Sequence, residues 1–131
     1  MCVFCDILAG KIACSMVHEN ENVCAFLDIS PVNYGHTLVV PRKHYENMHE
    51  IPEEVLMDVI KVVKKVAQSL KDNLDIQGFN IFQNNGIVAG QVVPHLHFHV
   101  IPRNDKDGLK HWTGGRYGDG DELEILNKIK F

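Results

Sequence analysis

The stretch His95-Leu96-His97-Phe98-His99-Val100-Ile101 alternates three histidines with apolar residues. In an extended strand, successive side chains point to opposite faces, so the three imidazoles share one face and the apolar residues share the other. The apolar face suits a buried core. The other face gathers side chains that can accept a proton, attack phosphorus or carbon, or bind a metal near neutral pH. The pattern therefore predicts a functional strand rather than plain scaffold.

Two other interpretations of this strand remain open. The histidines could simply face solvent on an edge strand, although strict alternation preceded by Gly86, Gly90 and Pro94 is not typical of that arrangement. They could instead bind one metal ion together. Same-face neighbours on a strand are roughly 6.6 Å apart at the backbone, so two of them can converge on an ion but three do so poorly. We therefore expect the three histidines to have different tasks.

The length and composition indicate one compact domain over residues 1–131. The chain is 45% hydrophobic, which is enough for an ordinary core, and its net charge of -4 does not favour binding to a nucleic-acid polymer. Its apolar runs are too short to span a membrane, and its first residues lack the features of a signal peptide. We therefore expect a cytoplasmic protein, in which cysteines stay reduced.

The order of the predicted elements indicates the α+β class. Apolar residues recur at three- and four-residue steps over 52–74, which predicts one long helix, and a short terminal helix is expected over 121–130. Short connections between the other apolar runs favour an antiparallel sheet of about five strands. Four of its strands are expected over 23–27, 37–40, 80–83 and 95–101.

At the alternating histidines the sequence resembles the histidine-triad (HIT) family of nucleotide-binding proteins. The resemblance extends over nearly the whole chain and is weakest after Arg103. Gln91 and the pair Pro102-Arg103 look more like its prokaryote-type branch. Further matching segments are Cys2-Val3-Phe4-Cys5 with Ile7 and Gly10, Ala25–Pro31, Gly35–Pro41, and Asn84, Gly86 and Gly90-Gln91.

The resemblance implies a HIT-like fold and a homodimer. It also implies an enzyme that hydrolyses or transfers nucleoside monophosphate groups of the AMP type. The expected substrates are purine nucleoside phosphoramidates or dinucleoside polyphosphates, cleaved at the α-phosphate. A covalent nucleotidyl-histidine intermediate is part of that expectation.

The expected catalytic cluster is His36, His95, His97 and His99. His97 would attack the α-phosphorus with one ring nitrogen, while a backbone carbonyl near His95 holds the proton on the other. His99 would contact the phosphate or leaving group and could supply a proton. By resemblance, His36 belongs to the same cluster and supports the nucleophile. No catalytic divalent cation is required.

The expected nucleotide contacts come from two loops. Asp28 can accept hydrogen bonds from two ribose hydroxyls, although it could equally cap the turn at Ser30-Pro31. Asn84 could bridge substrate and site, although Asn85-Gly86 is also an ordinary turn pair. The remaining candidates are Ile7, Phe26 and Ile29 around the base, Gly90, Gln91 and Val92 as backbone donors to the phosphate, and His97 and His99.

A zinc site is a further expectation. Cys2-x-x-Cys5 is half of a zinc-ligand pattern, and no second pair of this kind exists in the chain. The resemblance implies that His44 and His95 complete a closed structural site, which would leave His97 free to react. The alternative is a pair of reduced, unliganded cysteines at a frayed terminus. Cys14 and Cys24 are expected to be buried small hydrophobic residues.

Two other classes of function compete with the enzyme. The first is a nucleotide-binding regulatory module whose hydrolysis is incidental; binding alone does not require a nucleophile such as His97. The second is a metal-dependent hydrolase or dioxygenase that uses two histidines of the strand. The sequence shows no obvious acidic ligand beside those histidines.

Overall fold

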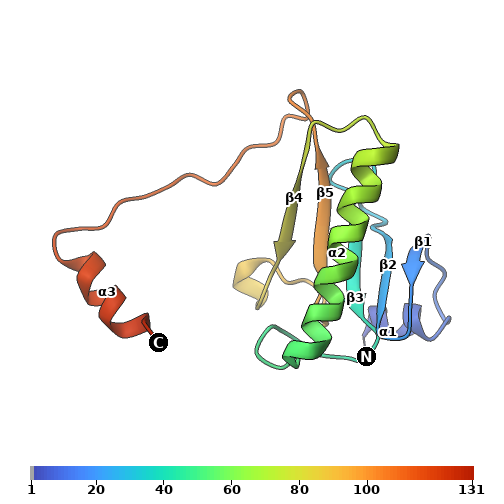
Figure 1. Ribbon diagram of the computed structural model, residues 1–131, viewed down its shortest axis with the longest axis horizontal. Coiled ribbons are helices and arrows are strands. Elements are labelled where there is room, and N and C mark those ends of the chain that lie inside the picture. Colours follow the sequence, from blue (N-terminus) through green and yellow to red (C-terminus); the bar gives the residue numbers. More distant parts are fainter. Residues whose placement is uncertain (1) are drawn as a thin grey trace.

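A computed structural model describes residues 2–131 of the chain; Met1, the first residue of the expected domain, lies outside them. Five strands form one antiparallel sheet in the order β1-β2-β3-β5-β4 (Figure 1). The α+β class and the antiparallel sheet are confirmed. The elements are α1 Val3–Leu8, β1 Met16–Glu19, β2 Val23–Leu27, β3 Thr37–Pro41, α2 Glu53–Asn73, β4 Gly78–Gln83, the 3-10 turn Ile87–Ala89, β5 Phe98–Arg103 and α3 Asp121–Ile129.

The predicted elements agree closely with the observed ones, with three differences. Strand β2 has the expected bounds, and β3, β4, α2 and α3 differ from the expected ranges by no more than two residues at either end. The sequence analysis did not predict α1 or β1. Strand β5 begins at Phe98 rather than His95, because the backbone at 95–97 forms no ladder with a neighbouring strand. His95 and His97 therefore lie in the segment that enters β5.

Helix α2 covers one face of the sheet and supplies most of the larger core (Figure 1). Its buried side chains recur on one side of the helix, as the periodicity predicts. They pack against Leu96, Phe98 and Val100, the apolar members of the histidine stretch. The predicted apolar face of that stretch is therefore confirmed.

The opposite face of the sheet carries a second, smaller core. Phe4 of α1 packs there on Phe26 of β2 and Leu38 of β3, with a ring separation of 5.6 Å between the two phenylalanines. Because both faces of β2 and β3 are covered, these strands are apolar on both sides instead of alternating. The register pairs Leu38 with His99, so His99 belongs to this second face.

The last part of the chain leaves the sheet. After Asp107 it runs as an extended segment to α3, which Figure 1 shows well away from the sheet. The side chains of Leu123, Leu126 and Ile129 are 63%, 52% and 66% exposed. Within residues 2–131, no helix has both the length and the apolar character that crossing a membrane requires.

Candidate active site

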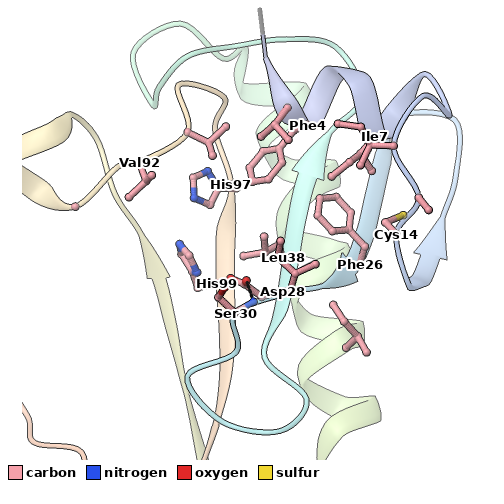
Figure 2. A pocket seen from close by; sticks show the side chains of 17 residues that line it. Phe4, Ile7, Cys14, Phe26, Asp28, Ser30, Leu38, Val92, His97 and His99 are labelled. Carbon is pink, nitrogen blue, oxygen red and sulfur yellow. Dashed lines mark hydrogen bonds between the residues drawn. The ribbon is translucent and has the colours of Figure 1, made fainter.

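A pocket of about 450 Å³ opens on the face of the sheet that carries α1. Figure 2 shows His97 and His99 together on one side of it, with Phe4, Ile7 and Phe26 on the other. Asp28 and Ser30 lie at its lower edge, next to His99. The pocket thus places apolar side chains beside a pair of imidazoles. This is the arrangement expected where a flat ring must be held and a polar group beside it must react.

The ring of His97 is held in one orientation and one tautomer. Its Nδ1 lies 2.7 Å from the backbone oxygen of His95, so Nδ1 carries a proton and donates it to that carbonyl. The edge of Phe4 supports the ring, with centroids 5.1 Å apart. Burial lowers the pKa of His97, which keeps the ring neutral. The lone pair therefore resides on Nε2, the nitrogen a nucleophile would use.

A hydrogen bond from His36 fixes the tautomer of His99. The backbone N–H of Val32 donates to His36 Nδ1 at 3.1 Å, so the proton of neutral His36 is on Nε2. That nitrogen lies 2.9 Å from His99 Nδ1 and donates to it. His99 Nδ1 is consequently an acceptor, and the ring proton of His99 is on Nε2. His36 thereby makes His99 a donor toward any group bound beside it.

Both of these histidines are neutral in the free protein. Burial is the largest cause of the lowered pKa of His36, and it lowers the pKa of His99 to about 4, with the neighbouring His97 and His36 adding to the shift. Asp28 acts in the opposite direction on both rings but does not reverse the effect.

Asp28 lies between the imidazoles and the loop that follows β2. Its Oδ1 accepts the backbone N–H of Ser30 at 2.8 Å, and its Oδ2 lies 3.7 Å from His36 Nε2. The turn-capping bond expected as the alternative role is therefore present. Asp28 also lines the pocket, so capping and ligand recognition are compatible.

This arrangement corrects one sequence-based argument. The metal-dependent alternative was disfavoured because no acidic ligand was evident, yet donor atoms of Asp28, His36 and His99 lie within 4.8 Å of one another. The sequence could not show this, because 63 positions separate the two histidines. In the structure the 2.9 Å hydrogen bond between the two rings already occupies the facing nitrogens.

The other expected contact residues divide into two groups. Ile7, Phe26, Ile29, Gly90 and Val92 line the pocket, with Ile29 and Val92 94% and 90% exposed. Asn84 and Gln91 do not line it. The buried Gln91 side chain accepts from the N–H of Gly86 and donates to the oxygen of Glu46, and Asn84 donates weakly to Gly90 at 3.4 Å. Both therefore shape the 84–91 loop from within.

The two remaining cysteines differ from each other. Cys24 is fully buried in the smaller core, as expected. Cys14 is partly exposed and lines the pocket beside Phe26, which was not expected (Figure 2). The segment 11–15 has no regular periodicity from which this position could be inferred.

A second cluster lies at the other end of the histidine segment. The thiols of Cys2 and Cys5 approach His95 Nδ1 at 3.5 and 3.6 Å, and Cys5 Sγ lies 3.4 Å from His44 Nδ1. In a tetrahedral site with Zn–S of about 2.3 Å and Zn–N of about 2.05 Å, sulfur and nitrogen ligands are about 3.6 Å apart. The spacing of the four donors therefore fits a zinc ion.

The surroundings of His95 also fit that role. Its Nε2 lies 2.9 Å from the oxygen of Pro41 and donates to it, so Nδ1 is left unprotonated toward the thiols. Burial lowers the pKa of His95, which favours the neutral ring that a metal needs. Cys2 also caps α1, since its sulfur accepts the N–H of Cys5 at 3.5 Å. The residues present thus fit a closed structural zinc site.

The fold and the site define a class: an antiparallel α+β protein with a histidine cluster beside an apolar pocket. The sequence profile of the HIT domain matches residues 9–106. The chain therefore belongs to the HIT family, as the resemblance predicted.

Relatives and solved structures agree with this assignment. An uncharacterised HIT-like protein of Methanocaldococcus jannaschii is 51% identical over 130 residues, covering 99% of each chain. An adenosine 5′-monophosphoramidase of Candida albicans is 40% identical, covering 97% of this chain and 87% of its own. A HIT family member from Bacillus subtilis superposes with a TM-score of 0.91 at 42% identity, covering 98% of this chain and 94% of that one.

One solved structure bears on the cysteine–histidine cluster. A zinc-bound histidine triad protein from Mycobacterium smegmatis superposes with a TM-score of 0.79 at 33% identity, covering 98% of this chain and 97% of that one. A zinc ion is thus compatible with this fold. Which residues of this chain would bind it follows from the donor geometry of Cys2, Cys5, His44 and His95.

Proposed function

We propose that this protein is a nucleotidyl hydrolase or transferase that cleaves at the α-phosphate and uses His97 as its nucleophile. The single observation that carries the proposal is the fixed tautomer of His97, whose Nδ1 is committed to the His95 carbonyl at 2.7 Å. A binding module has no need of a neutral imidazole that is held with its lone pair free. The name of the Candida albicans relative supports a nucleoside phosphoramidate as substrate.

The proposed first step is displacement at phosphorus. His97 Nε2 forms a bond to the α-phosphorus as the bond to the leaving group breaks, and the electron pair stays on the leaving nitrogen or oxygen. That atom accepts a hydrogen bond from the Nε2–H of neutral His99, whose Nδ1 already accepts from His36, and it takes its proton from solvent. The product on the enzyme is a nucleotidyl group on His97. Its positive charge is shared with the Nδ1–H that donates to His95.

The second step restores the enzyme. Water attacks the same phosphorus, the P–Nε2 bond breaks, and the electron pair returns to His97. The proton released by water passes to solvent, which returns the proton taken up in the first step, so the two steps balance. An alcohol or phosphate in place of water would give transfer rather than hydrolysis.

The chemistry of the pocket lining supports the proposed contacts to the rest of the nucleotide. The apolar side chains of Ile7, Phe26 and Ile29 suit the faces of a purine, and Asp28 Oδ2 suits the ribose hydroxyls. Gly90 and Val92 border the phosphate side.

We further propose a structural zinc on Cys2, Cys5, His44 and His95, and a homodimer of cytoplasmic location. Zinc would tie the N-terminal helix to the segment that carries His97 and take no part in the reaction. The exposed apolar side chains of α3 support association with a second copy, because a monomer rarely leaves such a face uncovered. Light scattering of the full chain tests this; a monomer at micromolar concentration would contradict it.

The test of the enzyme proposal compares wild type with His97→Ala on a fluorogenic adenosine 5′-phosphoramidate in excess chelator. We expect turnover by the wild type and a loss of about 10⁴-fold or more in the variant, since no other group can take the place of the nucleophile. His49→Ala, an exposed histidine outside the pocket, is the matched control and should keep the rate.

Three outcomes would contradict it. Nucleotide binding by the wild type with no turnover of phosphoramidates or dinucleoside polyphosphates would favour the regulatory module. Turnover that chelator abolishes and a divalent cation restores would favour a metal held by Asp28, His36 and His99. Full activity in the His97 variant would exclude the covalent route.

A further inference from the structure

An ion pair lies just beyond the end of β5, outside the imidazole cluster. Arg103 Nε donates to Asp107 Oδ2 at 2.6 Å, and its second nitrogen donates to Oδ1 at 3.2 Å. The two side chains are only 17% and 6% exposed. The guanidinium holds the pKa of Asp107 well below its usual range, so the carboxylate stays charged. Such a pair is rigid, because two parallel bonds fix both distance and orientation.

Asn33 connects this ion pair to the loop that carries Asp28. The Asn33 side-chain amide donates to Asp107 Oδ2 at 3.1 Å and to the backbone oxygen of Pro102 at 2.8 Å. The backbone oxygen of Asn33 accepts the N–H of His36 at 3.0 Å, and the oxygen of His36 accepts the N–H of Asp28 at 2.9 Å. Three successive hydrogen-bonded steps therefore join Asp107 to the backbone of Asp28.

The 28–36 loop is tightly packed around Gly35. Gly35 has φ +91, and a Cβ there would lie 2.9 Å from Leu74 Cδ1 and 3.2 Å from Pro102 Cγ. The backbone of the loop is thus packed directly on the end of α2 and on β5. In contrast, the tip residues Ile29 and Tyr34 are 94% and 93% exposed and provide no anchor. The Asn33 amide is the side chain that ties this loop to the ion pair.

We propose that Arg103 and Asp107, acting through Asn33, are positioning residues that set the place of Asp28 and so determine how strongly the site recognises a ribose. The inference rests on the proposed ribose contact of Asp28. None of the three residues lines the pocket. Their influence on the nucleotide is therefore indirect, through the backbone of the 28–36 loop.

A purely structural role makes a different prediction from a positioning role. An ion pair that only stabilises the fold would weaken every ligand to the same extent when it is broken. A unit that positions Asp28 acts on the ribose hydroxyls alone, because a carboxylate displaced by a few tenths of an ångström loses hydrogen bonds and leaves apolar contacts intact. The comparison of a ribonucleotide with its 2′-deoxy counterpart separates the two.

The experiment measures the dissociation constants of AMP and 2′-deoxy-AMP by calorimetry, using the full chain as purified. For Asn33→Ala we expect AMP to bind about tenfold more weakly and 2′-deoxy-AMP to change by less than about threefold. Asp28→Ala is the reference that removes the ribose contact itself, and it should abolish discrimination between the ligands. Asp107→Asn, which keeps the shape but removes the charge, should act in the same direction as Asn33→Ala.

The matched control is Asn80→Ala. Asn80 of β4 accepts from the same Arg103 at 2.7 Å but has no bond to the 28–36 loop. It should leave the ratio of the two dissociation constants unchanged, whatever its effect on the melting temperature.

Each alternative outcome overturns the inference. Equal weakening of both ligands by Asn33→Ala indicates a structural role, and a wild type that does not discriminate removes the ribose contact on which the inference depends. Loss of discrimination in Asn80→Ala as well would show that general loosening is the cause. Because the readout is binding, absence of hydrolysis would count against the proposed enzyme alone and would leave this test decisive.

Discussion

His95 and His99 lie on either side of His97 in the same alternating pattern, yet their surroundings differ completely. His95 is fully buried. Its Nε2–H donates a hydrogen bond to the backbone oxygen of Pro41, and its Nδ1 faces the thiols of Cys2 and Cys5. His99 is partly exposed, accepts at Nδ1 from His36 and keeps its proton on Nε2 beside the pocket. The comparison shows that the hydrogen-bond partner, rather than the residue type, decides which nitrogen is available and for what chemistry.

The largest expected effect is a loss of stability when the cysteine partners of His95 are changed. Replacing Cys5 by serine removes one of the four proposed zinc ligands, so we expect loss of the proposed zinc and a fall of several kcal/mol in the free energy of unfolding. For a chain of this size that corresponds to a drop of about 10 °C or more in melting temperature. The checks are elemental analysis and calorimetry. Cys14→Ser is the control, and equal zinc content in both variants would contradict the assignment.

The second effect concerns the pH dependence of stability on the His99 side. The folded pKa of His99 is lowered to about 4 by burial, whereas that of the unfolded chain is about 6.5. Between these values the unfolded state binds more protons. Stability from this group is complete above about pH 6.5 and is lost as the pH falls toward 4.

The corresponding measurement compares wild type with His99→Gln by denaturant unfolding between pH 7 and pH 4. The neutral variant should lose about 3 kcal/mol less than wild type over this range, since one pKa unit corresponds to about 1.4 kcal/mol. Subtracting the two curves removes the contribution of groups present in both proteins. Parallel curves would mean that His99 is protonated normally in the folded protein.

The smallest expected effect concerns the hydrogen bond from His36 to His99, which fixes the tautomer of His99. His36→Ala removes the donor to His99 Nδ1, so the ring can adopt either tautomer. We expect kcat to fall about tenfold with little change in KM, because binding does not require a particular tautomer. The ¹⁵N shifts of His99 should show loss of the Nε2–H form.

A conservative replacement sharpens that test. His36→Gln keeps an N–H donor in this position and should recover part of the lost rate. Equal losses in the alanine and glutamine variants would show that the imidazole of His36 acts by its shape or charge instead.

Much of the fold followed from local sequence patterns. The period of apolar residues gave α2 and its buried face, and short apolar runs between loops gave β2, β3 and β4. Strand β1 was missed because its four residues are all exposed, so its sequence does not alternate between apolar and polar residues as a half-buried strand does. Helix α1 was missed because six residues are too few for a helical period to stand out.

The site was predictable in its members more than in its arrangement. The pattern indicated His97 and His99 and a hydrogen bond to a backbone carbonyl near His95, which in the structure is the carbonyl of His95 itself. It could not show that Asp28 lies beside His36, that Cys14 lines the pocket, or that Asp107 is tied to the loop through Asn33. Each of these depends on elements brought together by the sheet.

The sequence by itself determined which side chains are the candidates for the proposed chemistry, because strand alternation and helical periodicity are local properties of the backbone. It therefore specified the apolar face that meets α2 and the imidazoles that do not. Only the tertiary structure decided what each imidazole does. The proton of a neutral histidine lies on the nitrogen that faces a hydrogen-bond acceptor. The acceptor is the backbone oxygen of Pro41 for His95 and the backbone oxygen of His95 for His97. For His99, His36 donates to Nδ1 and so leaves the proton on Nε2. Two of these partners are more than 50 positions away, and packing alone sets their distances.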